Sequence, residues 1–172
     1  MVKYRRFYVP GGTYFFTATL HDRKSDWLIK HIRQLGDAMR RVRDIHPYKT
    51  IAMVVLPDHL HVIWELPEND ANFSLRWRCI KSLFTKKLTA SGVNIAKNAF
   101  GENILWQRRF WEHMIRDEKD YARHVDYIHF NPVKHQLVTR VADWPFSTFH
   151  RYVNKGLLPR NWAYRNDDLD VE

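Results

Sequence analysis

Residues 48–66, YKTIAMVVLPDHLHVIWEL, contain two strand-like runs and a short connection between them. β-Branched and other apolar side chains dominate both runs, and Pro57-Asp58 separates them as a tight turn. Strands joined so closely pair in antiparallel fashion. The segment therefore predicts a β-hairpin with strands at residues 48–56 and 59–66, around which the other elements are arranged.

The elements on both sides of this hairpin follow two periodicities. Residues 14–20 are aromatic and β-branched and predict a strand, whereas residues 25–44 and 73–88 carry apolar side chains every three or four positions, as helices do. Residues 111–115 predict a fourth strand, and residues 117–131 a third helix that ends before the next proline. This order is that of an α+β, ferredoxin-like or RRM-like sandwich with an antiparallel sheet and an additional C-terminal helix.

The composition indicates one globular domain. The 172 residues are 45% hydrophobic and 27% charged, which excludes collagenous and wholly disordered classes. We expect a single domain at residues 1–165, followed by an acidic tail at residues 166–172. The single cysteine excludes a disulfide framework, and no apolar run approaches the ~20 residues that span a bilayer. We therefore expect no membrane partner and a cytoplasmic location.

The charge balance predicts a nucleic-acid partner. Lys and Arg number 28 against 19 Asp and Glu, a net charge of +9, and such a surface attracts polyanions. Aromatic residues make up 15% of the chain and offer stacking surfaces for unpaired bases. The alternative is a solvated basic surface over an aromatic core. The predicted DNA-binding residues lie on the second helix and just before the fourth strand: Arg76, Arg78, Lys81, Lys86, Lys87, Trp106, Arg108 and Arg109.

Two histidines begin the second strand of the hairpin. Side chains alternate along a strand, so His59 and His61 share one face while Leu60 and Val62 take the other. Two imidazoles at this spacing can hold a divalent cation, but a third ligand must come from elsewhere in the fold. A structural or surface histidine pair is the alternative interpretation.

The third helix offers the missing groups. Tyr127 and Asn131 are four residues apart and lie on the same helical face, so both can reach one site. Asn131 can offer a carbonyl oxygen to the cation, and Tyr127 a phenolic oxygen to a group bound there. Alternatively, Tyr127 packs into the core and Asn131 caps the helix. Tyr121 competes as nucleophile but has no amide four residues later.

A metal beside a tyrosine suits DNA strand transfer. The cation offsets the negative charge of a phosphodiester and positions it for attack. Because a phenolate is a better leaving group than an alkoxide, a phosphotyrosine ester stays reactive, and the break can be resealed without ATP. A nuclease that activates water with the same cation is not excluded by the sequence.

Four motifs resemble the REP-associated tyrosine transposases, bacterial single-tyrosine members of the HUH class of DNA-processing enzymes. They are VLPDHLHVIW at 55–64, LWQRRFWEH at 105–113, YIHFNPVKH at 127–135 and WPFSTF at 144–149. Glu112 stands where many relatives carry Asp, and the acidic tail lies outside the match.

The resemblance implies a ferredoxin-like fold and Mg²⁺ or Mn²⁺ dependence. It makes His59, His61 and Asn131 metal ligands, and makes Tyr127 a nucleophile that forms a 5′-phosphotyrosine link and leaves a 3′-hydroxyl. It implies single-stranded DNA with hairpins formed by repetitive extragenic palindromes (REP elements) as the partner, and a nucleoid-associated protein. The second hypothesis is an RRM-like nucleic-acid binder without catalytic activity.

Overall fold

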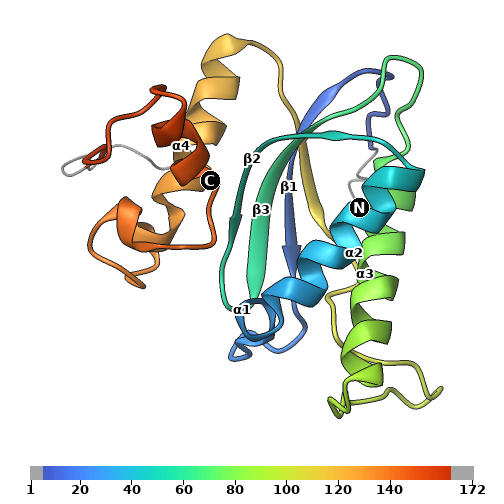
Figure 1. The fold of residues 1–172 in the computed structure, drawn as a ribbon. Coiled ribbons are helices and arrows are strands. Elements are labelled where there is room, and N and C mark those ends of the chain that lie inside the picture. Colours follow the sequence, from blue (N-terminus) through green and yellow to red (C-terminus); the bar gives the residue numbers. More distant parts are fainter. Residues whose placement is uncertain (1–5, 164–172) are drawn as a thin grey trace, which may run out of the picture.

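A computed structural model describes residues 6–163, and its centre is one antiparallel sheet (Figure 1). The strands are β1 (Thr13–Thr19), β2 (Lys49–Val55), β3 (His59–Glu65) and β4 (Trp111–Met114). They are ordered β2-β3-β1-β4, and each neighbouring pair is antiparallel. The predicted hairpin forms one side of this sheet, and the long strands β1 and β3 lie in its centre.

Helices cover the two faces of the sheet unequally, as Figure 1 shows. Three helices lie on one face, and the fourth lies on the opposite face with the C-terminal segment. The first three are α1 (Trp27–Lys30), α2 (Ile32–Ile45) and α3 (Phe73–Ala90), and the opposite group is α4 (Glu118–Lys134), the short 3-10 helix η1 (Val141–Asp143) and α5 (Phe149–Asn154). The predicted α+β sandwich is confirmed.

Strand β3 is buried on both faces, and its alternation assigns each side chain to a layer. Leu60, Val62 and Trp64 pack in the core beneath α2 and α3. Ile63 belongs to the smaller core beneath α4, and His59 and His61 share its face because they are two and four residues away. The histidine pair therefore faces the helix that carries Tyr127.

The segment 144–152 covers the free edge of β2. Trp144 donates its indole N–H to the carbonyl of Val55 (2.9 Å), and the Thr148 backbone N–H donates to the carbonyl of Met53 (2.8 Å). An uncovered edge strand would present unpaired backbone groups. This segment contains the WPFSTF motif, which thus closes the sheet beside the hairpin that carries His59 and His61.

Two predicted helices differ most from the structure, one in its continuity and the other at its C-terminal end. The helix expected at 25–44 is divided at His31 into α1 and α2. Helix α4 does not end before Pro132 but continues through it to Lys134. Proline removes only one backbone donor, and in the last turn of a helix few hydrogen bonds depend on it. Asn131 is therefore helical, which keeps it in line with Tyr127.

Within residues 6–163, no helix is long and apolar enough to span a membrane. The expected domain end at residue 165 and the tail 166–172 lie outside the described residues.

Candidate active site

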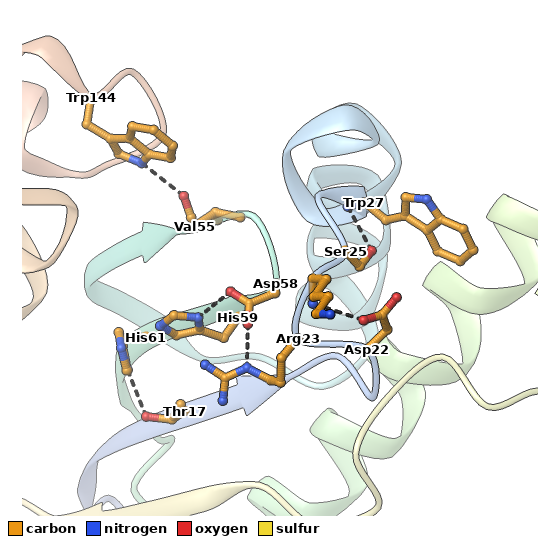
Figure 2. A network of polar contacts seen from close by, with 11 residues as sticks. Thr17, Asp22, Arg23, Ser25, Trp27, Val55, Asp58, His59, His61 and Trp144 are labelled. Carbon is orange, nitrogen blue, oxygen red and sulfur yellow. Dashed lines mark hydrogen bonds and ion pairs between the residues drawn. The ribbon is translucent and has the colours of Figure 1, made fainter. Parts of the chain in front are cut away.

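His59 and His61 lie beneath α4 with their ring centroids 5.0 Å apart. Both side chains are buried, and Figure 2 shows each imidazole held by a different polar partner. The strand places them side by side, as their spacing predicts. The group that orients His59 is its neighbour in the chain, whereas the group that orients His61 comes from another strand.

Asp58 orients His59. The Nδ1 atom of His59 lies 2.8 Å from Oδ1 of Asp58, whose other oxygen pairs with Arg23. Burial acts to raise the pKa of Asp58, but its interactions with His59 and Arg23 outweigh burial and leave the pKa below its ordinary value. An ionised carboxylate can only accept, so Nδ1 of His59 carries the proton and Nε2 keeps its lone pair.

Thr17 holds His61 from the neighbouring strand. The two residues are directly paired in the β1·β3 ladder, and the Thr17 hydroxyl lies 2.7 Å from Nδ1 of His61 (Figure 2). The remaining ring nitrogen, Nε2, is buried without a hydrogen-bond partner in the described part of the chain. Buried polar atoms normally have a hydrogen-bond partner, so we expect this nitrogen to bind a group that is not part of the described chain.

Helix α4 brings Tyr127 and Asn131 to the same place. The Tyr127 ring is 5.3 Å from the His61 ring, centroid to centroid, and is 5% exposed. Asn131 is fully buried, and neither polar atom of its carboxamide has a hydrogen-bond partner among residues 6–163. The structure thus assembles the two histidines, the amide and the phenol that the sequence singles out.

The electrostatics of the site favour neutral imidazoles. Burial lowers the pKa of His59, and burial followed by the positive charges of His59, His135 and Lys134 lowers the pKa of His61 well below its ordinary value. The nearby Asn131 side chain opposes the shift of His61 without making a hydrogen bond of normal geometry. Neutral imidazoles are the form that binds metal ions.

The donor set therefore fits a divalent cation. Across the described residues, His61 and Asn131 present buried polar atoms without hydrogen-bond partners. His59 and His61 each have Nδ1 engaged by an oxygen, which is the usual outer support of a metal-binding imidazole. Two imidazole nitrogens and one carboxamide oxygen would supply three ligands and leave room for substrate oxygens.

Two further residues, at the C-terminal end of α4 and just after it, reach the site and were missed in the sequence. The ammonium of Lys134 lies over the Tyr127 ring, 4.9 Å from its centroid. His135, at the end of the helix, has its ring centroid 5.0 Å from that of His59. Spacing could have found both, because the four-residue step from Tyr127 to Asn131 leads next to His135, and Lys134 lies seven residues after Tyr127.

The structure contradicts the DNA-binding role predicted for Arg76. Its side chain is 1% exposed, donates to the carbonyls of His46, Pro47 and Asn72, and forms an ion pair with Asp70 (2.8 Å). A guanidinium whose donors are used inside the fold cannot also contact phosphate. Arg76 instead attaches α3 to the loop that follows α2.

The other predicted DNA-binding residues lie at the surface to different degrees. Exposed side chains are Arg78, Lys86, Arg108 and Arg109, and half-buried ones are Lys81, Lys87 and Trp106. The ammonium of Lys81 lies 5.7 Å from the ring centroids of both Trp106 and Phe110. Burial, and then the charge of Arg6, lowers the pKa of Lys81 to about 8. Lys81 thus joins helix α3 to the aromatic segment before β4, on the side of the sheet opposite α4.

Comparison with known proteins gives matches along the whole chain, although no protein-family model matches. An Escherichia coli (strain K12) protein named REP-associated tyrosine transposase is 50% identical over 163 residues, 95% of this chain and 92% of the relative. A Haemophilus influenzae protein named for the same family is 44% identical over 174 residues, 100% of this chain and 98% of the relative. A solved REP-associated tyrosine transposase, bound to a REP hairpin, has a TM-score of 0.84 and 46% identity and covers 100% of this chain and 98% of that chain.

Proposed function

Because this chain belongs to the family of REP-associated tyrosine transposases, we propose that it cuts and rejoins single-stranded DNA beside REP-type hairpins, with Tyr127 as the nucleophile. The observation that carries the assignment of Tyr127 is the 5.3 Å distance between its ring centroid and that of His61. Tyr127 also lies on the helical face that presents Asn131. Membership of a family of named transposases supports the enzyme over the non-catalytic RRM-like binder.

His59, His61 and Asn131 are the proposed metal ligands. Nε2 of His61 and the carboxamide of Asn131 have no hydrogen-bond partner within residues 6–163, which supports this assignment. A divalent cation held there, Mg²⁺ or Mn²⁺, would offset phosphate charge and fix the phosphate beside the phenol. Asp58 and Thr17 act on the ligands rather than on the DNA, because each contacts the opposite nitrogen of a histidine ring.

The proposed reaction exchanges one phosphate ester for another. The phenolic oxygen of Tyr127 loses its proton to solvent and bonds to the phosphorus, and the bond from phosphorus to the 3′ oxygen of the preceding nucleotide breaks. That oxygen takes up a proton and becomes the free 3′-hydroxyl. Since one phosphodiester replaces another, a DNA 3′-hydroxyl can reverse the step and reseal the strand.

Lys134 is the proposed source of further positive charge during this exchange. Its ammonium lies over the ring of Tyr127, and its charge contributes to the lowered pKa of His61, so it faces both the nucleophile and the metal ligands. A cation there would stabilise the negative charge that the phosphate oxygens gain as the phenol attacks.

The surface of α3 and the segment before β4 is the proposed contact for the DNA backbone. Arg78, Lys86, Arg108 and Arg109 would neutralise phosphates, whereas Lys81, beside Trp106, would combine a charge with a stacking surface. Contacts of this kind position the strand without reading its sequence.

The test of the nucleophile is covalent capture. The purified chain is incubated with Mn²⁺ and a REP-hairpin oligonucleotide that extends as a single strand, and the products are separated on a denaturing gel. We expect a 5′ protein–DNA adduct that EDTA prevents. Tyr127→Phe should abolish the adduct and retain hairpin binding, whereas Tyr121→Phe, which changes the exposed competing tyrosine of the same helix, should leave it intact.

Other outcomes have distinct meanings. An undiminished adduct in Tyr127→Phe would refute the assignment of Tyr127 as the nucleophile. Cut ends free of protein would identify a hydrolase that uses water, and hairpin retardation without cutting would identify the non-catalytic binder.

A further inference from the structure

A second group of possible metal ligands lies between β4 and the first turns of α4. His113 comes from β4, and Asp120 and His124 come from α4. One ligand atom from each residue lies within 4.8 Å of the other two. Asp120 and His124 are buried, whereas the side chain of His113 is 26% exposed, which leaves a path from solvent.

Both imidazoles direct a nitrogen toward the same carboxylate. The Nε2 atom of His113 is 2.8 Å from Oδ2 of Asp120, and Nδ1 of His124 is 3.1 Å from Oδ1. The two rings are stacked, with centroids 4.7 Å apart and planes at 14°. Ligand atoms around a tetrahedral zinc ion lie about 3.3 Å apart, so a small outward movement of the three side chains would admit the ion.

The protonation states also suit a cation. Burial acts to raise the pKa of Asp120, but the hydrogen bonds from His113 and from the backbone N–H of Arg116 outweigh it and leave the pKa lowered. Burial is the main cause that lowers the pKa of His124. The carboxylate is therefore ionised and His124 neutral near pH 7.

A bound ion would replace the direct contacts of His113 and His124 with the Asp120 carboxylate, and two further contacts would have to yield. Nδ1 of His124 lies 2.8 Å from the backbone carbonyl of Asp120, a contact that metal coordination would replace. The guanidinium of Arg116 lies 3.6 Å from Oδ2 of Asp120 and competes for the same charge, but its side chain is 71% exposed and can turn into solvent. The backbone N–H of Arg116 (3.0 Å) would continue to support the carboxylate from outside.

We propose that His113, Asp120 and His124 form a second metal site, of the kind that binds zinc, which links β4 to α4 one turn before Tyr127. This site is separate from the set formed by His59, His61 and Asn131. Two imidazoles and one carboxylate are a common protein ligand set for zinc, with water as the fourth ligand. The Phe15 ring separates the two sets, with its centroid 4.8 Å from His124 and 5.5 Å from His61. Metal binding at this second site would not require the transposase chemistry.

The test counts zinc ions on the full chain. Protein stripped with a chelator is titrated with Zn²⁺ by calorimetry and with Co²⁺, whose visible absorption reports tetrahedral coordination. His113→Gln should bind one equivalent fewer than the wild type and lose the corresponding Co²⁺ absorption and Zn²⁺-dependent thermal stabilisation. His21→Gln, which removes an exposed imidazole that belongs to neither set, should match the wild type.

Arg116→Ala gives a second test of the site that does not require His113→Gln to fold. Removing the competing guanidinium should tighten zinc binding at this site roughly fivefold, the effect of one exposed ion pair. Unchanged stoichiometry and affinity in a folded His113→Gln, or unchanged zinc affinity in Arg116→Ala, would overturn the second site.

Discussion

Thr17 and His61 face each other across strands β1 and β3, and the Thr17 hydroxyl lies 2.7 Å from Nδ1 of His61. Metal binding through Nε2 requires the proton on Nδ1, where the threonine oxygen can accept it. Asp58 holds His59 in the same way, at 2.8 Å from its Nδ1. Both candidate ligands thus have a supporting oxygen, one from the adjacent residue and one from a strand more than forty residues away in the sequence.

The first prediction concerns Thr17. Thr17→Val keeps the shape of the side chain but removes the oxygen, so the His61 ring loses its preferred orientation and protonation. We expect Mn²⁺ affinity, measured by calorimetry, to fall roughly 10- to 100-fold with little change in thermal stability. Thr13→Val, at the other end of β1, is the matched control. Unchanged Mn²⁺ affinity would show that the hydroxyl does not support the ligand.

The second prediction concerns Lys134. If its ammonium stabilises the charge of the attacked phosphate, Lys134→Gln should slow adduct formation about 100-fold in single-turnover assays and leave hairpin affinity nearly unchanged. Lys134→Arg should restore part of the rate because it restores the charge. Lys119→Gln removes an exposed cation from the first turn of the same helix and should react like the wild type. Equal losses of rate in both glutamine variants would indicate a general effect of net charge.

The third prediction separates Arg76 from Arg78, two residues apart on α3. Arg76→Met leaves several buried carbonyls and Asp70 without their donor, so the free energy of unfolding should fall by about 3 kcal/mol in urea titrations. Arg78→Met should change the free energy of unfolding by less than about 0.5 kcal/mol. It should lower the slope of log binding constant against log salt concentration by about one, the effect of losing one phosphate contact. A stable Arg76→Met with weakened DNA binding would reverse this assignment.

The fourth prediction is a pH dependence of stability that comes from His129. This imidazole is fully buried, with Nε2 2.9 Å from the Thr148 hydroxyl, and burial, followed by Arg151 and His150, lowers its pKa to about 4. In the unfolded chain the pKa is about 6.5, so the unfolded state binds more protons between pH ~6.5 and ~4. Stability from this group is therefore lost as pH falls through that window, by about 3 kcal/mol in all.

The measurement compares urea unfolding of the wild type and His129→Gln at pH 7 and pH 4.5. The variant should lose less stability on acidification. The lowered pKa values of His59, His61 and His124 act in the same direction in both proteins, so the difference between the two isolates His129. Parallel losses in the two proteins would contradict the prediction.

The sequence predicted most of the elements because their periodicities are strong. It was wrong at Pro132, where the general avoidance of proline in helices is weaker than the packing of α4 on the sheet. It was also wrong at Arg76, because the charge of a residue does not show whether its partners are phosphates or carbonyl groups of the same chain. Nothing in the sequence linked Thr17 to His61, or His113 to Asp120 and His124, since strand register and helix docking make those contacts.

The local geometry of strand and helix alone determined which side chains share a face in two pairs of residues. A strand repeats every two residues and a helix nearly every four, so His59 had to share a face with His61, and Tyr127 with Asn131. Only the tertiary structure decided that these two faces meet, because that depends on the apolar surface that α4 and the sheet bury between them. It also decided which basic side chains remain at the surface, because burial is set by all the elements packed around a residue and not by the residue itself.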